Sequence, residues 1–140
     1  MLPCVLVIDE FPPTLELYHE LLESDSYELE LSNYEFEDLT MIERLQPALI
    51  LLDFQVDQQN RNRGWQLFDK LKMSRSLSSL PIIICTPSML DIREQEQYLQ
   101  DQGILIFYKP FNQEKLVQRV QHIVAASQSQ EASKKNGDSG

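Results

Sequence analysis

The chain has 140 residues and a formal net charge of −10, from 12 Lys and Arg against 22 Asp and Glu. This length predicts one domain, large enough to bury a core without disulfides or a structural metal. Residues 1–43 carry 12 acids and no Lys or Arg. This balance argues against direct nucleic-acid binding, which depends on neutralising phosphates. No apolar run approaches the ~20 residues of a membrane span and the N-terminus does not resemble a signal peptide, so we expect a cytoplasmic protein with no membrane partner.

Cysteines and glycines exclude several further kinds of site. Cys4 and Cys85 do not have the spacing of zinc ligands, and they indicate two buried, reduced thiols. The four glycines form neither a dinucleotide-binding fingerprint nor a phosphate-binding loop of the Walker type.

Strand and helix patterns alternate five times along the chain. Four predicted strands are apolar runs, at 5–8, 48–52, 81–85 and 104–107. The remaining one, at 27–31, alternates apolar and acidic residues, as a half-covered edge strand would. The predicted helices begin at Pro12–Pro13, at Phe36, near Trp65, at a Ser88–Asp91 capping box and after an Asn112 cap. Pro47 and Gly103 end the second and fourth of these helices. The domain should span residues 3–126, and residues 127–140, with one apolar residue, should be a disordered tail or linker.

This alternation predicts an α/β fold in which an open, doubly wound parallel sheet of five strands is covered by helices on both faces. The third predicted strand is apolar on both faces, as a central parallel strand should be. Folds of this kind bind ligands at the carboxyl ends of their strands.

Polar residues follow four of the five predicted strands. Asp9 and Glu10 end the first, Asp53 the third, Thr86 the fourth and Lys109 the fifth. Two carboxylates about 4 Å apart repel by about 4 kcal/mol at an effective dielectric of 20, so three of them favour a bound cation. Oxygen ligands favour Mg²⁺ over zinc. With a lysine and a hydroxyl for an incoming anion, this set predicts phosphoryl transfer to a carboxylate.

Four segments at these strand ends resemble a known family. They read V-L-V-I-D-E, P-A-L-I-L-L-D-F, L-P-I-I-I-C-T-P and Y-K-P-F, in that order. Over residues 3–126 the chain resembles the receiver domain of bacterial two-component response regulators. The resemblance implies a flavodoxin-like fold with strand order 2-1-3-4-5. That order would separate Cys4 from Cys85 by a strand, too far for a disulfide.

The same resemblance assigns roles to individual residues. It makes Asp53 the phosphoacceptor and gives the Mg²⁺ ligands as Asp9, Glu10, Asp53 and the backbone carbonyl of Gln55. Thr86 would be the switch hydroxyl, and Lys109 would bind the phosphoryl group, with a cis peptide before Pro110. The domain would have no enzymatic activity beyond self-phosphorylation and self-dephosphorylation at Asp53.

Partners also follow from the resemblance. A sensor histidine kinase or a phosphotransfer protein would donate the phosphoryl group, and a downstream effector protein or output domain would respond to it. A homodimer is possible through the fourth helix, the fifth strand and the fifth helix. The cognate kinase and the presence of an output domain are left open by the sequence.

Four positions depart from the family's pattern. Glu10 stands where the family usually has Asp, and Ile106 occupies the aromatic switch position. Gly64 follows Asp53 by eleven residues instead of eight, so the loop 54–63 is about three residues longer than usual. Pro87 has no N–H, whereas the residue after the switch hydroxyl normally donates its N–H to the phosphoryl group. We therefore expect a weaker or shorter-lived phosphorylated state.

Two functions are consistent with this sequence. In the first, Asp53 is phosphorylated and the domain signals. In the second, the domain is a pseudo-receiver, a protein-interaction module that acts without phosphorylation. Pro87, Ile106 and the long loop favour the second, and the complete set of strand-end residues favours the first. A haloacid-dehalogenase-type phosphatase is excluded, because it requires D-x-D where this chain has Asp9-Glu10-Phe11.

Overall fold

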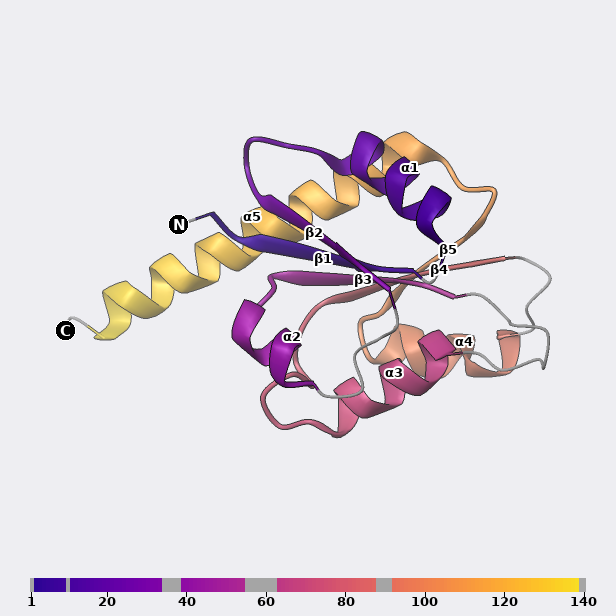
Figure 1. Ribbon diagram of the computed structural model, residues 1–140. Coiled ribbons are helices and arrows are strands. Elements are labelled where there is room, and N and C mark those ends of the chain that lie inside the picture. The colour runs from indigo at the N-terminus through magenta and orange to yellow at the C-terminus, as the bar shows by residue number, and fades with distance from the viewer. Residues whose placement is uncertain (1, 10, 34–38, 55–62, 88–91, 139–140) are drawn as a thin grey trace.

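Five parallel strands form one sheet in the order β2-β1-β3-β4-β5 (Figure 1). The computed structural model describes residues 2–9, 11–33, 39–54, 63–87 and 92–138. The strands are β1 (Cys4–Ile8), β2 (Glu28–Ser32), β3 (Leu49–Asp53), β4 (Ile82–Pro87) and β5 (Leu105–Lys109). Every neighbouring pair is parallel. The predicted fold class and strand order are therefore confirmed.

Helices cover both faces of the sheet. The first face is covered by α1 (Pro12–Leu22) and α5 (Gln113–Asp138), and the second by α2 (Thr40–Leu45), α3 (Arg63–Met73) and α4 (Arg93–Asp101) (Figure 1). Because helices cover both faces of the sheet, β1 and β3 are buried at every position, which explains their continuous apolar runs.

The pleat of the strands divides the core into two clusters. Odd-numbered strand residues such as Val5, Val7 and Leu51 pack against α1 and α5. Even-numbered residues such as Leu6 and Leu52 pack against the helices of the second face. Since side chains alternate strictly along a strand, the residue number predicts which face each strand-end side chain joins.

Local sequence signals explain the start of α1 and the ends of α2 and α4. Prolines at the first positions of α1 fit a helix start, since their missing N–H groups would have no partner there. Gln46 adopts a left-handed conformation with φ of 47° at the end of α2, directly before Pro47. Gly103, with φ of 77°, ends the turn after α4, where a side chain would be strained.

Two predicted helix starts fall on segments outside the described residues. The Ser88–Asp91 capping box is one of these, and α4 begins later, at Arg93. Its N-cap is Ile92, which makes no side-chain capping bond. The predicted start of the second helix at Phe36 also lies outside the described residues, and α2 begins at Thr40.

The last helix is longer than the sequence predicts. α5 continues to Asp138, so residues 127–138 are helical where we expected a disordered tail, and in Figure 1 this end of the helix extends past the sheet. The apolar periodicity of the sequence does stop near residue 126, and the expectation of a disordered tail rested on that stop. Ser, Gln, Glu, Ala and Lys are nevertheless tolerated in helices, and no proline follows Pro110. Once α5 is nucleated on the sheet, nothing in its sequence stops it before Gly137.

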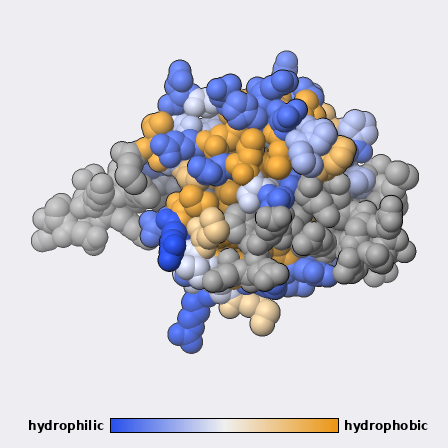
Figure 2. Space-filling view, viewed as in Figure 1, coloured by the Kyte–Doolittle hydropathy of each residue, from blue (hydrophilic) through white to orange (hydrophobic). Residues whose placement is uncertain are grey.

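Both cysteines are buried and neither forms a disulfide, as predicted. Burial, followed by the charges of Glu30 and Glu28, raises the pKa of Cys4 to about 11, so this thiol stays protonated. Figure 2 shows hydrophilic side chains gathered over α1 and hydrophobic ones below them, toward the sheet. Within the described part of the chain, no helix is long and apolar enough to cross a membrane.

Candidate functional site

Two carboxylates are completely buried where β1 and β3 end. Asp53 is the last residue of β3, Asp9 directly follows β1, and both have 0% relative exposure. Both positions are odd-numbered, so they continue the pleat face that carries Val7 and Leu51 toward α1 and α5. The backbone N–H of Asp9 donates to the carbonyl of Ser32 at 2.9 Å, which ties this residue to the end of β2.

Lys109 neutralises one of these carboxylates directly. It is the last residue of β5 and shares the pleat face of Leu105 and Phe107. Its Nζ lies 2.7 Å from Oδ1 of Asp53, and the lysine side chain is 29% exposed. The distance is that of a charge-assisted hydrogen bond. The predicted convergence of Asp53 and Lys109 is therefore present.

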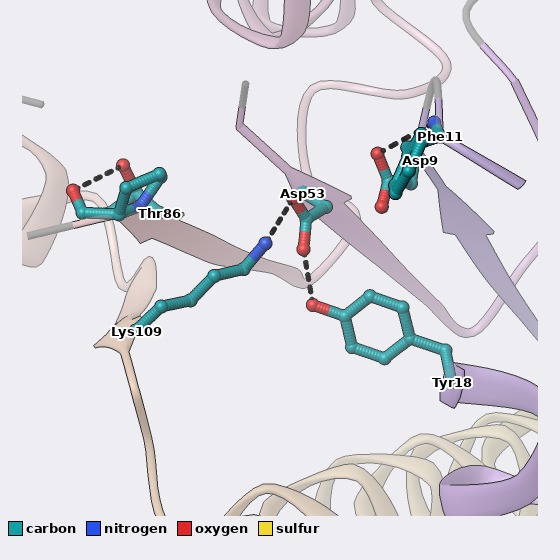
Figure 3. A network of polar contacts seen from close by, with 7 residues as sticks. Asp9, Phe11, Tyr18, Asp53, Thr86 and Lys109 are labelled. Carbon is teal, nitrogen blue, oxygen red and sulfur yellow. Dashed lines mark hydrogen bonds and ion pairs between the residues drawn. The ribbon is translucent and has the colours of Figure 1, made fainter. Parts of the chain in front are cut away.

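Tyr18 is a site residue that sequence reasoning missed. The helical periodicity of α1 places it on the inward face and by itself predicts only a core residue. Its hydroxyl donates to Oδ2 of Asp53 at 2.5 Å, and the residue is 2% exposed (Figure 3). One signal could have found it: a buried tyrosine needs a polar partner, and the odd-numbered face of the sheet beneath α1 ends in Asp9 and Asp53.

Burial controls the electrostatics of Asp9. Burial, followed by the negative charge of Asp53, raises its pKa to about 6. The backbone N–H of Phe11, which donates to Oδ1 of Asp9 at 3.2 Å, opposes this rise, as do Lys109 and the side chain of Thr14. An anionic Asp9 is therefore costly here unless a cation compensates the two carboxylates.

Thr86 lies on the other side of the pleat. Its neighbours Cys85 and Phe107 carry odd numbers and face α1 and α5, whereas Thr86 is even-numbered. The Thr86 hydroxyl donates to the carbonyl of Pro87 at 3.4 Å, a long hydrogen bond. Figure 3 shows it across the Lys109 side chain from Asp53. Thr86 is thus at the predicted strand end and buried, and its hydroxyl is bonded away from the carboxylate.

Pro87 and Lys109 are partners in the sheet. β4 continues through Thr86 to Pro87, and Pro87 pairs with Lys109 of β5. The peptide bond between Lys109 and Pro110 is cis, as expected. Ile106 is half-buried and packs against the α2–α4 side of the core, so the position of the aromatic switch carries an aliphatic side chain there.

The described donors are those that a magnesium ion prefers. Asp9 and Asp53 provide two buried carboxylates on neighbouring strands, and hard oxygen donors suit Mg²⁺. The other two predicted ligands, Glu10 and the carbonyl of Gln55, lie outside the described residues. In the described ranges no three His, Cys, Asp or Glu residues form a group that could hold a metal. The donor set thus fits the ion through two carboxylates.

The sequence profile of the family described as "response regulator receiver domain" matches residues 5–121. The chain belongs to this family. The match therefore extends from β1 through all of β5 and into the first part of α5. No curated protein sequence matches the chain.

Solved structures of other receiver domains have the same fold. The signal receiver domain of a putative LuxO repressor protein from Vibrio parahaemolyticus has a TM-score of 0.74 at 20% identity, covering 94% of this chain and 97% of that one. A CheY-like receiver domain from Methanospirillum hungatei gives 0.70 at 21%, covering 93% and 99%. A response regulator receiver modulated diguanylate cyclase from Pelobacter carbinolicus gives a TM-score of 0.67 at 24% identity, covering 94% of this chain and 99% of that one. At these identities the similarity establishes the fold alone.

Proposed function

We propose that this receiver domain accepts a phosphoryl group on Asp53 from a histidine kinase or a phosphotransfer protein, and that phosphorylation alters its binding to an effector protein or output domain. One observation carries the proposal. A completely buried carboxylate at the end of the central strand is paired with Lys109 at 2.7 Å and lies on the same pleat face as a second buried carboxylate, Asp9. A carboxylate with a purely structural role would not need a second buried carboxylate beside it. A carboxylate that binds a cation and attacks a phosphoryl group would.

Each residue has a role in that chemistry. Lys109 would neutralise the phosphoryl oxygens as they approach, and the Thr86 hydroxyl would turn from the Pro87 carbonyl to donate to them. Asp9, Asp53, Glu10 and the Gln55 carbonyl would hold Mg²⁺, which supplies positive charge to the transferring group when bound. Asp53 is the nucleophile, and activity of the domain itself is limited to taking and losing its own phosphoryl group.

The experiment is phosphorylation of the purified chain by acetyl phosphate and Mg²⁺, resolved on a phosphate-affinity gel. We expect a shifted band that is absent from the Asp53→Asn variant and absent when EDTA is added. Asp69→Asn, which removes an exposed carboxylate on α3, is the matched control and should shift like the wild type. A shift that persists in Asp53→Asn contradicts the assignment of the phosphoacceptor.

A second candidate is the pseudo-receiver, which binds a partner without phosphorylation. Two observations favour it: Pro87 cannot donate an N–H, and the Thr86 hydroxyl is directed to the Pro87 carbonyl. No shift with acetyl phosphate, or with any histidine kinase tested, would support this function over the first.

Partner identity and assembly belong to the same proposal. The predicted dimer surface of α4, β5 and α5 contains Tyr98, which is 52% exposed, and a β5 that is half-buried at every position. We propose this surface as the place where a second copy or an effector binds, and a cytoplasmic location for the domain.

A further inference from the structure

Tyr18 occupies an enclosed position over the carboxylate of Asp53. It projects from the inward face of α1 into the core cluster formed by that helix, α5 and the odd-numbered strand residues. Its ring is 2% exposed and its hydroxyl donates to Oδ2 of Asp53 at 2.5 Å (Figure 3). A phenylalanine would fill this core position equally well, so packing alone does not explain the hydroxyl.

Side chains hold both oxygens of the Asp53 carboxylate. Lys109 lies on Oδ1 and Tyr18 lies on Oδ2, and the two side chains come from different elements, β5 and α1. Lys109 is partly exposed and carries a charge that can follow an incoming phosphoryl group. Tyr18 differs, because its hydroxyl is buried and, among the described residues, the charged group that it contacts is the carboxylate itself.

Tyr18 remains a hydrogen-bond donor at all physiological pH values. Burial, together with the nearby Cys85 and Asp53, raises its pKa far above the usual value for a tyrosine. Burial likewise raises the pKa of Cys85 to about 12, so the thiol beside the Tyr18 hydroxyl is neutral. If the hydroxyl leaves Asp53, the Cys85 sulfur that it also contacts is only a weak acceptor.

We propose that the Tyr18 hydroxyl is an inhibitory contact on the phosphoacceptor, which lowers both the rate and the extent of phosphorylation. The inference rests on the proposed function of Asp53. In the transfer from acetyl phosphate, a bond forms between a carboxylate oxygen of Asp53 and phosphorus while the bond from phosphorus to the acetate oxygen breaks, and acetate leaves. The proton of Tyr18 stays on its oxygen throughout.

The inhibition follows from where the negative charge lies before and after transfer. Before transfer, Tyr18 donates to an anionic carboxylate, which makes the hydrogen bond charge-assisted. After transfer, the charge resides on the phosphoryl oxygens and the acyl oxygens of Asp53 are neutral, so the same hydroxyl donates to a weaker acceptor. An interaction that is stronger in the ground state than in the transition state slows a reaction.

Tyr27 offers a matched control for the loss of one buried hydroxyl. It is 3% exposed, belongs to the same core cluster, and donates its hydroxyl to the backbone carbonyl of Leu22. It therefore loses an equivalent buried donor on substitution by phenylalanine, without any contact to Asp53 in the described hydrogen bonds.

The experiment compares the wild type with Tyr18→Phe and Tyr27→Phe, using acetyl phosphate and Mg²⁺ with the Asp53→Asn variant as the blank. We expect Tyr18→Phe to be phosphorylated about tenfold faster, and to a higher final fraction, because a charge-assisted hydrogen bond is worth about that factor or more. Tyr27→Phe should match the wild type in rate, and thermal unfolding should show that each variant is folded.

A second readout uses Trp65 and needs no covalent step. The Trp65 ring lies edge-on to Phe54, with ring centroids 6.0 Å apart, and Phe54 directly follows Asp53 in the chain. Beryllofluoride with Mg²⁺ should therefore change the fluorescence of Trp65, and Tyr18→Phe should bind it about tenfold more tightly than Tyr27→Phe.

The outcomes separate this inference from the proposed function. If the wild type and Tyr18→Phe are phosphorylated at equal rates, or the variant is slower, the inhibitory contact is refuted while the phosphoacceptor stands. If neither is phosphorylated and neither binds beryllofluoride, the proposed function itself fails. Phosphorylation of Tyr18→Phe alone would support both.

Discussion

The two sides of Asp53 are organised differently. On the side of α1 and β5, two donors hold the carboxylate, Lys109 at 2.7 Å and Tyr18 at 2.5 Å. On the side of β4, Thr86 bonds to the carbonyl of Pro87, and Pro87 itself has no N–H to offer. The donors of the unphosphorylated site therefore bind the carboxylate of Asp53, and the β4 side offers no donor that is already directed at a phosphoryl group.

The cause of this difference is the pleat of the sheet. Asp9, Asp53 and Lys109 all fall on the odd-numbered face that α1 and α5 cover, whereas Thr86 falls on the opposite face. Residues on one face meet without any rearrangement, and a residue on the other face must rotate to join them. The contacts of the unphosphorylated site therefore follow from the odd or even position of each residue along its strand. Under the proposed function, contacts from the β4 side to the site would form only when a phosphoryl group is bound.

The largest expected effect comes from removing the charge on the α1 and β5 side. Lys109→Ala should reduce the rate of phosphorylation by acetyl phosphate about 100-fold or more, because a preorganised donor to the transferring group is lost. Band-shift time courses on a phosphate-affinity gel measure this rate.

Lys72→Ala is the matched control for that prediction. Lys72 donates to the carbonyl of Ser78 at 3.1 Å and lies over Phe68, on the α3 side of the molecule. Its loss should leave the phosphorylation rate unchanged. A phosphorylation rate of Lys109→Ala within threefold of the wild type corresponds to a barrier difference of only about 0.7 kcal/mol. That result would show that Lys109 does not stabilise the transferring phosphoryl group.

The second prediction concerns Asp9 and the pH dependence of stability. Its pKa is raised to about 6 in the folded state from an ordinary value of 3.8. A raised carboxyl pKa means that the fold is favoured when Asp9 is protonated, so this contribution is present below pH 3.8 and is lost as the pH rises through 6. Asp9→Asn should therefore stabilise the metal-free protein by up to about 3 kcal/mol at pH 7.5, and by much less at pH 4.

Urea unfolding in EDTA at the two pH values measures that difference. Mg²⁺ should stabilise the wild type at pH 7.5 and narrow its gap to Asp9→Asn, since an ion that binds only the folded state adds to its stability. Asp25→Asn, at an exposed position before β2, should change the free energy of unfolding by less than about 0.5 kcal/mol. An equal gain from Asp9→Asn at both pH values would contradict the account.

Much of this organisation could be predicted from the sequence because it depends on short-range patterns. Continuous apolar runs fixed the parallel sheet, and acids or a lysine directly after those runs placed Asp53 and Lys109 at one edge. The resemblance to receiver domains then supplied the strand order and the cis peptide before Pro110, which the structure contains. Burial of both cysteines followed from their positions in strands.

The rest could not be predicted because it depends on which groups meet in three dimensions. Helical periodicity placed Tyr18 inside, but only the packing of α1 across the end of β3 brings its hydroxyl to Asp53. The apolar periodicity of α5 also ends near residue 126, although the helix continues to Asp138. A helix that has already formed can extend through residues that give no apolar signal in the sequence. The direction of the Thr86 hydroxyl is a rotamer choice, on which the sequence carries no information.

The smallest expected change affects the β4 side and concerns Pro87. Replacing it by alanine restores a backbone N–H next to Thr86, at a position held in the sheet by its pairing with Lys109. A charge-assisted hydrogen bond of about 1.5 kcal/mol to the phosphoryl group would lengthen the phosphorylated half-life by about tenfold. The half-life is measured by removing acetyl phosphate and following the loss of the shifted band.

Pro81→Ala is the control for the Pro87 prediction, because it makes the same chemical change at the other end of β4. Pro81 is exposed, and its carbonyl accepts a hydrogen bond from the N–H of Ile50 at 3.0 Å, which alanine retains. The phosphorylated half-life of Pro81→Ala should equal that of the wild type. If Pro87→Ala also leaves the half-life unchanged, the missing N–H does not limit the phosphorylated state. The asymmetry of the site would then reside in Tyr18 and Lys109 alone.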